Sequence, residues 1–174
     1  MDTASVTPAA NAPSAGITGF LPFFAEGCDT LILGSFPSVK SRETAFYYGH
    51  PRNRFWATLA EYYSSPLPVT VEEKKALLAA HGIALWDVVT ECEIKGSADA
   101  SIRDYTVADV PAFIAAHGIS RVFVNGKRAL SILLAAHPDL APVVKLLPST
   151  SPANPRFDKK EWFDALDTFR PLPL

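Results

Sequence analysis

The chain has 174 residues, of which 48% are hydrophobic and 20% are charged, and its formal net charge is −2. These ordinary values suit one globular domain with a sizeable core, and they argue against a protein that coats nucleic acid through its overall charge. No apolar run approaches the roughly 18 residues of a membrane span, and the two cysteines, Cys28 and Cys92, form no zinc or iron–sulfur motif.

The first seventeen residues are rich in Ala, Ser, Thr and Pro, and they lack the basic start and apolar stretch of a secretory signal. We expect residues 1–17 to form a flexible tail and residues 18–174 to form a single domain. We also expect a monomer in the reducing cytoplasm, with no metal, no cofactor and no membrane association.

The first half of the chain begins with a short apolar run that predicts a buried strand. A long loop from Gly34 to about Arg52 follows, and loops of this length are often functional. In chain order, we expect a strand at Thr30–Leu33, that loop, helices at Arg54–Tyr63 and Val71–His81, and a strand at Ile83–Val89.

The second half repeats the alternation of strands and helices. Thr106 followed by Asp109 predicts a capped helix that runs to His117, because Gly118 comes next. In chain order, we expect a polar loop at Glu91–Arg103, that helix, a strand at Arg121–Asn125, a helix at Gly126–His137, a strand at Val143–Leu146, a proline-rich loop at Pro148–Pro155 and a helix at Lys159–Thr168.

Alternating strands and helices predict an α/β domain with a largely parallel sheet, which binds ligands at the carboxyl ends of its strands. The loops at that edge are Gly34–Arg52, Glu91–Arg103, the turn after Asn125, and Pro148–Pro155. Basic residues gather in Lys40–Arg54, Arg121–Arg128 and Lys145–Lys160, whereas acids gather between Glu61 and Asp109. Ordinary surface patterning explains any one of these segments, but three near strand ends would suit a DNA-binding face.

Three segments carry residue types that suit contact with a nucleic acid base or its backbone. Gly34–Ser38 (GSFPS) follows the first strand, where successive N–H groups can hold an oxygen. Tyr47–Trp56 (YYGHPRNRFW) supplies aromatic rings for stacking and cations for phosphates. Leu147–Asn154 (LPSTSPAN) joins rigid prolines to small hydroxyls. The structural alternatives are plain turns for the first and third segments, and core positions for Phe55 and Trp56.

Together, the first two segments resemble the mismatch-specific uracil glycosylase branch of the uracil-DNA glycosylase superfamily. The pattern is G-x-x-P-x, a gap of matching length, and then aromatic-G-H-P-x-N-R-F-W. Further similar segments are Leu85–Val89, Gly96–Ile102 and Leu147–Ser151, so that the resemblance covers roughly Thr30 to Leu166. It implies a three-layer α/β/α fold with a small, largely parallel four-stranded sheet.

One departure from the motif indicates the branch. The catalytic Asn or Asp of the first motif falls on Phe36, which cannot orient a water molecule. The resemblance is then to the hypoxanthine-DNA (deoxyinosine) glycosylases, which lack that side chain. It implies a base-excision-repair hydrolase that cuts the N-glycosidic bond of deoxyinosine in DNA. The alternatives are a uracil or thymine mismatch glycosylase, a lesion-binding protein without catalysis, and a nucleotide-binding α/β domain unrelated to DNA.

The resemblance also assigns expected roles to single residues. Asn53 is the candidate for positioning the attacking water. Tyr48 would stack on the flipped base, the N–H groups of Ser35 and Phe36 would bind its O6, and Asn125 would read its edge. The expected DNA contacts are Ser38, Lys40, His50, Arg52, Lys127, Ser149, Thr150 and Ser151, and Pro152 or Ala153 lies in the loop that would carry a wedge.

Three other polar residues have more ordinary interpretations. Asp87 lies in an apolar strand, where a carboxylate more often caps a loop or pairs with a base than takes part in catalysis. Asp99 suits an ion pair with Arg103. Lys95, like Lys40 and Lys127, suits a phosphate contact better than a Schiff base, because its surroundings in the sequence are not apolar.

Overall fold

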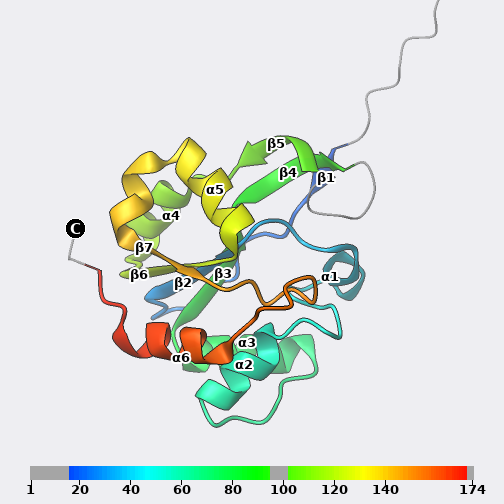
Figure 1. Ribbon diagram of the computed structural model, residues 1–174, viewed down its shortest axis with the longest axis vertical. Helices are drawn as coiled ribbons and strands as arrows, with labels where there is room; N and C mark the ends of the chain where they lie inside the picture. The colour runs from blue at the N-terminus through cyan, green and yellow to red at the C-terminus, as the bar shows by residue number, and fades with distance from the viewer. Residues whose placement is uncertain (1–15, 95–101, 172–174) are drawn as a thin grey trace, which may run out of the picture.

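The computed structural model describes residues 16–94 and 102–171 (Figure 1). Its centre is a four-stranded sheet in the order β3-β2-β6-β7, with every neighbouring pair parallel. The strands are β2 (Thr30–Gly34), β3 (Ile83–Asp87), β6 (Arg121–Asn125) and β7 (Val144–Leu147). Gly34 pairs with Asp87 and Asn125 pairs with Leu147, so the four carboxyl ends form one row at one edge.

Helices cover both faces of this sheet, as Figure 1 shows, and the expected three-layer α/β/α fold is confirmed. Along β2, Leu31 and Leu33 pack into the core on one face, whereas Ile32 packs into the core on the other. The first core is closed by α4 (Val110–His117) and α5 (Lys127–Ala136), and the second by α2 (Phe55–Tyr62), α3 (Val71–Ala80) and α6 (Lys159–Thr168).

Local chemistry sets several helix boundaries. Thr70 and Glu73 form a capping box at the start of α3. Gly118 adopts a left-handed conformation at the end of α4, where its φ is 63°. A 3-10 helix over Pro138–Val143 joins α5 to β7. No helix in the described ranges has the length and hydropathy needed to cross a membrane.

A second, antiparallel sheet is the main difference from the sequence-based expectation. Its strands are β1 (Ile17–Thr18), β4 (Val89–Ile94) and β5 (Ile102–Val107), in the order β1-β4-β5. The predicted polar loop at Glu91–Arg103 is therefore wrong at both of its ends, while residues 95–101, with Lys95 and Asp99, lie outside the described residues. Glu91 is exposed and Cys92 is buried, as in a strand with one solvated face. Ile17, the last residue of the predicted tail, pairs with Cys92.

Three smaller differences concern element boundaries. The long loop after Gly34 contains a short helix, α1 (Val39–Thr44), because the Ser38 hydroxyl accepts a hydrogen bond from the Ser41 N–H (3.1 Å) and caps it. Asp109, not Thr106, is the N-cap of α4. The predicted strand Ile83–Val89 is divided, since β3 ends at Asp87 and β4 begins at Val89.

Candidate active site

A cavity of about 100 Å³ lies at the carboxyl edge of the parallel sheet. It is formed by the ends of β2, β3 and β6 together with the loops that follow β2 and β7. Its lining is mostly polar, with two tyrosines and few charges. The lining residues are Gly34, Ser35, Phe36, Pro37, Ser38, Ser41, Tyr47, Tyr48, Asn53, Asp87, Asn125, Ser149, Thr150 and Ser151.

The cavity wall formed by the segment after β2 carries an apolar side chain, Phe36, at the position where the glycosylase motif has Asn or Asp. Phe36 lines the cavity, is only 7% exposed and belongs to the hydrophobic core on the α4–α5 side. A Cβ built on Gly19 would lie 3.2 Å from the Phe36 ring, so the segment before β2 packs closely behind this ring. Phe36 therefore offers this wall an aromatic surface and only its backbone for hydrogen bonding.

Tyr48 stands across the cavity with its backbone in the left-handed region, at a φ of 54°. One face of its ring stacks on Phe55, with centroids 4.0 Å apart and planes 20° apart. Burial and the nearby charge of Asp87 raise the pKa of the Tyr48 hydroxyl, while the amide of Asn125 lowers it by less. Tyr48 therefore stays a neutral phenol at physiological pH and can donate a hydrogen bond.

Asn53 lies two residues before α2, next to the N-cap Arg54, and reaches the cavity from its half-buried position. Its side-chain oxygen accepts a hydrogen bond from the Phe55 N–H (2.9 Å), and its own N–H donates to the carbonyl of His50 (2.9 Å). The N-cap residue Arg54 makes no side-chain capping bond, so Asn53 supplies the first turn of α2 with an acceptor. These contacts hold the Asn53 amide in one orientation at the cavity wall.

The loop after β7 is fastened to β6 by a side-chain pair. The Asn125 amide nitrogen donates to the Thr150 hydroxyl (3.0 Å), and the Thr150 N–H donates to the Asn125 amide oxygen (3.0 Å). Both side chains are buried. The Trp162 indole donates to the Pro148 carbonyl (2.8 Å), which ties the start of the loop to α6.

Arg54 holds the same loop from the side of α2. Its guanidinium donates to the carbonyls of Ser151 (2.6 Å) and Asn154 (2.7 Å), and its backbone N–H donates to the carbonyl of Thr150 (3.0 Å). The guanidinium also lies over the ring of Phe157, 4.6 Å from its centroid. The residue that follows Asn53 thus anchors the loop of Ser149–Ser151, and the two walls of the cavity form one connected unit.

The uracil DNA glycosylase superfamily model matches residues 21–168, nearly the whole described chain. The protein belongs to the uracil-DNA glycosylase superfamily. A Methanosarcina acetivorans protein named hypoxanthine DNA glycosylase is 34% identical over 151 residues, which cover 83% of this chain and 94% of that protein. A Methanosarcina barkeri protein of the same name is 32% identical over 113 residues, or 64% of this chain and 72% of that protein.

A solved structure supports the same placement. The solution NMR structure of a Methanosarcina acetivorans protein, provisionally assigned as a uracil DNA glycosylase, matches with a TM-score of 0.74 and 30% identity. The match covers 88% of this chain and all of that one, at 100%. The resemblance seen in the motifs is thereby confirmed at the level of the superfamily and its fold.

In this superfamily member, the residues expected to touch the base and the water come together. Ser35, Phe36, Tyr48, Asn53 and Asn125 all line the cavity. Among the expected DNA contacts, Ser38, Ser149, Thr150 and Ser151 line it too. Whether each residue plays its expected role stays a prediction.

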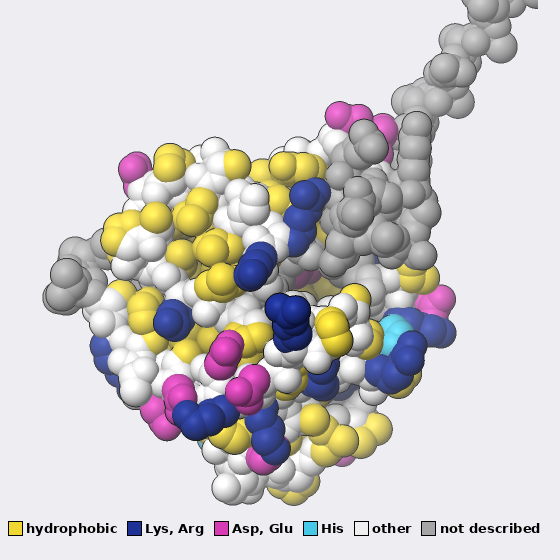
Figure 2. Space-filling view, in the orientation of Figure 1, with side chains coloured by type: hydrophobic (Ala, Val, Ile, Leu, Met, Phe, Trp, Pro, Cys, Tyr) yellow, Lys and Arg dark blue, Asp and Glu magenta, His cyan; other side chains and the backbone are white. Residues whose placement is uncertain are grey.

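The four expected basic DNA contacts lie outside the cavity lining. Lys40 is exposed and pairs with Glu43 (3.0 Å), and the His50 ring nitrogen accepts from the N–H of the exposed Arg52 (3.0 Å). Lys127 is the exposed first residue of α5 and lines a second cavity, which Pro148 and Ser149 also line. Figure 2 shows Lys and Arg side chains across the middle and right of this face, which suits contact with phosphates.

One basic segment does not belong to this surface. Arg121 opens β6, at the end of the sheet opposite the cavity, and its guanidinium bonds the Thr30 hydroxyl and the Leu166 carbonyl. Arg121 therefore does not contribute to a DNA-binding face at the ligand edge.

Several residues of the site were not among those expected from sequence. Tyr47, Ser41 and Pro37 line the cavity, and Arg54 organises the loop beside it. Asp87 lines it as well, at the end of β3. A carboxylate at the last residue of an otherwise apolar strand was the available signal, since strand ends form the ligand edge. No group of three His, Cys, Asp or Glu that could hold a metal occurs within residues 16–94 and 102–171.

Proposed function

We propose that this superfamily member hydrolyses the N-glycosidic bond between hypoxanthine and deoxyribose in DNA. The observation that carries the proposal is Phe36 in the cavity wall, at the motif position where an oxygen-bearing side chain would orient water. The two relatives named hypoxanthine DNA glycosylase support the same base. The hydrolysis must then depend on another polar group, and Asn53 is the candidate.

The target base has to leave the duplex to reach the cavity, at a cost of about a few kcal/mol that is smaller for a mispaired base. Phe55 covers one face of the Tyr48 ring, so the base would stack on the other face. The N–H groups of Ser35 and Phe36 would donate to O6 at the end of β2. Asn125 would contact the base only with the part of its amide that Thr150 leaves available.

The reaction consumes one water molecule and needs no other reactant. The C1′–N9 bond breaks with its electron pair going to the base, and the oxygen of water bonds to C1′. The proton from water ends on the departing base, which gives free hypoxanthine and an abasic site. The Asn53 amide would orient the water, and donors around the base would stabilise the charge that develops on it.

Ser149 and Ser151 are the better candidates for phosphate contacts in the loop after β7. Thr150 is 1% exposed, and both its hydroxyl and its N–H bond Asn125. It would therefore support the loop from beneath and not touch DNA directly. We also propose that the protein acts as a monomer, in the cytoplasm.

Duplexes that carry a single inosine, uracil or xanthine test the proposal. After incubation with the protein, hot alkali breaks the strand at each abasic site. Cleavage mainly at inosine is the expected result. Cleavage mainly at uracil would place the protein elsewhere in the superfamily, and binding without any cleavage would make it a lesion-binding protein.

A further inference from the structure

Asp87 is a buried carboxylate in the cavity that the proposed hydrolysis does not use. It is 4% exposed, ends β3 and pairs in the parallel ladder with Gly34. Among the described lining residues, it alone carries a carboxyl group. Burying a carboxylate is costly, so its retention at a ligand edge needs a structural or a functional reason.

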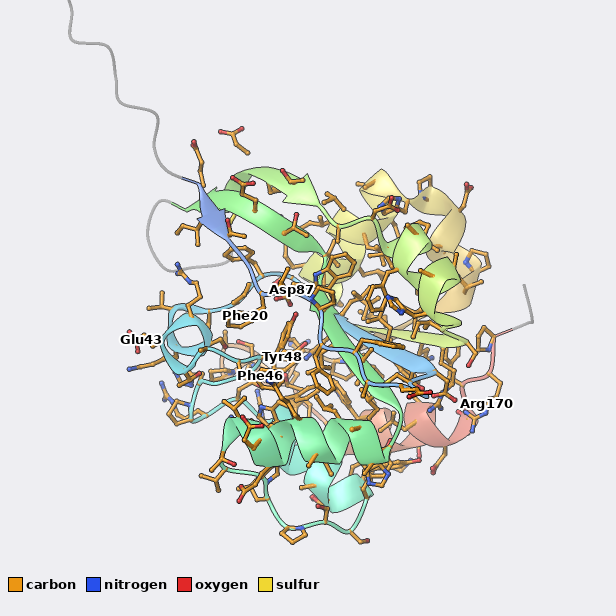
Figure 3. All side chains as sticks on the ribbon, turned by 180° about the vertical axis from the view of Figure 1, so that it is seen from behind. Phe20, Glu43, Phe46, Tyr48, Asp87 and Arg170 are labelled. Carbon is orange, nitrogen blue, oxygen red and sulfur yellow. The ribbon has the colours of Figure 1, made fainter. Side chains whose placement is uncertain are left out.

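The geometry directs Asp87 towards the same point as Tyr48. A Cβ built on Gly34 would lie 2.5 Å from the Asp87 Oδ1 and 2.9 Å from the Tyr48 hydroxyl oxygen. Two polar oxygens thus converge on the bare Cα of Gly34, and Figure 3 shows the Tyr48 side chain pointing towards Asp87. Burial raises the pKa of both Tyr47 and Tyr48, and the charge of Asp87 raises both further, so the carboxylate acts electrostatically on the cavity.

Deamination changes the hydrogen-bonding pattern of a base in a way that a carboxylate can detect. Adenine presents N1 as an acceptor, whereas hypoxanthine presents N1–H as a donor beside the O6 carbonyl. Uracil likewise carries N3–H next to a carbonyl, where its parent base cytosine presents N3 as an acceptor. A carboxylate accepts hydrogen bonds and donates none, so it attracts the N1–H of hypoxanthine and repels the N1 lone pair of adenine.

We propose that Asp87 accepts a hydrogen bond from the N1–H that deamination of adenine creates, and so selects hypoxanthine over adenine. This inference rests on the proposed function, because it concerns the base in the same cavity. It adds a determinant of selectivity, since the negative charge of Asp87 would oppose charge on the departing base and cannot speed its release. Ser35 and Phe36 would read the neighbouring carbonyl.

The test compares duplexes with deoxyinosine, whose N1 carries a hydrogen, and deoxynebularine, whose N1 is a bare acceptor. Asp87→Asn can donate to a bare acceptor, which Asp87 cannot. For the wild type and this variant, we would measure the single-turnover rate divided by Kd on each duplex and take the inosine-to-nebularine ratio. The intrinsic lability of each base cancels when the two ratios are compared. Asp139→Asn, an exposed carboxylate in the 3-10 helix, is the matched control.

The inference predicts that Asp87→Asn lowers the inosine-to-nebularine ratio by about tenfold or more, as for loss of a hydrogen bond to a charged group. Asp139→Asn should leave the ratio unchanged. Equal slowing of both substrates by Asp87→Asn would overturn the inference, because a carboxylate that only shapes the cavity would have that effect. A wild type that leaves inosine intact would instead refute the proposed function, and the inference would fall with it.

A second measurement serves if Asp87→Asn does not fold. Free hypoxanthine and 1-methylhypoxanthine, in which a methyl group replaces the N1 hydrogen, would be compared as inhibitors of wild-type cleavage. The inference predicts inhibition weaker by about tenfold or more for the methylated base. Equal inhibition by the two bases would show that no acceptor engages N1, and would overturn the inference.

Discussion

Asn125 and Thr150 hold each other by two hydrogen bonds, one from the amide nitrogen to the hydroxyl and one from the Thr150 N–H to the amide oxygen, both 3.0 Å long. This pair joins the end of β6 to the loop after β7. In a buried setting such reciprocal bonds fix both partners, since losing either leaves a polar group without a partner. The loop is thus already shaped before DNA arrives, which lowers the entropic cost of binding.

Thr150→Val tests this pair, because valine keeps the shape of threonine but lacks the hydroxyl. The Asn125 nitrogen loses its acceptor, so the free energy of unfolding should fall by about 1–2 kcal/mol. Urea denaturation would measure the change. Thr168→Val, which removes a hydroxyl from an exposed residue on α6, should have a much smaller effect. Equal stability of Thr150→Val and the wild type would mean that the pair contributes nothing net.

Arg54→Met removes the second anchor of the loop. Two short bonds to the Ser151 and Asn154 carbonyls disappear, so we expect a loss of about 2–3 kcal/mol in stability together with weaker DNA binding. Arg54→Lys should recover only part of the lost stability and of the lost DNA affinity, because an ammonium lacks the planar fork of the guanidinium. Lys159→Met, which breaks an exposed ion pair with Glu61, is the control and should cost little. If Arg54→Met were as stable as this control, the result would show that Arg54 does not anchor the loop.

Gly34→Ala tests the close approach at the cavity floor. Its Cβ would lie 2.5 Å from Asp87 Oδ1 and 2.9 Å from the Tyr48 hydroxyl, both well inside ordinary contact. We expect cleavage of inosine-containing DNA to fall by about tenfold or more, with a stability loss of about 1–3 kcal/mol from overpacking. Gly27→Ala meets open space, but its φ is 86°, so it should lose stability while keeping its activity. Full activity in Gly34→Ala would show that the floor can shift freely.

The parallel sheet could be predicted from sequence because its two central strands, β2 and β6, are short, almost entirely buried and flanked by turn residues. Thr30–Leu33 and Arg121–Asn125 match β2 and β6 to within one residue. The antiparallel sheet was missed because β4 and β5 carry charged residues on an exposed face. Glu91 and Glu93 suggested a polar loop, although Cys92 between them is buried. Cys92 pairs with Ile17, which is more than seventy positions away in the sequence, so no local pattern indicates the pairing.

The motifs predicted which residues line the cavity, but the hydrogen bonds around it could not be predicted from the sequence. Phe36, Tyr48, Asn53 and Asn125 could be selected because the resemblance to the glycosylase motifs assigns them roles, in segments that face the ligand edge. The bond from Arg54 to Asn154 spans 100 positions of sequence, so no local pattern could reveal it. Asp87 was visible as a carboxylate in an apolar strand, but only the fold shows that this strand end meets Tyr48.

Because Lys and Arg side chains lie across the face shown in Figure 2, the affinity for DNA should fall as the salt concentration rises. Lys127→Ala and Arg52→Ala should each reduce the slope of log Kobs against log salt by about 1, if each side chain contacts one phosphate. Fluorescence anisotropy on an inosine-containing duplex over a range of salt concentrations would measure the slopes. Lys160→Ala, whose ammonium pairs with Asp164 on the exposed face of α6, is the control. Unchanged slopes in both variants would place the phosphates elsewhere.

The most direct test of the account is single-turnover cleavage of an inosine-containing duplex by the wild type, Asn53→Ala and Asn53→Ser. Asn53 also caps α2, and serine can replace that function whereas alanine cannot. We predict that both variants cut about a hundredfold or more slowly, while their Kd for the duplex stays within about threefold of the wild type. Wild-type cleavage by Asn53→Ser would contradict the account, because the amide would then serve only to cap the helix.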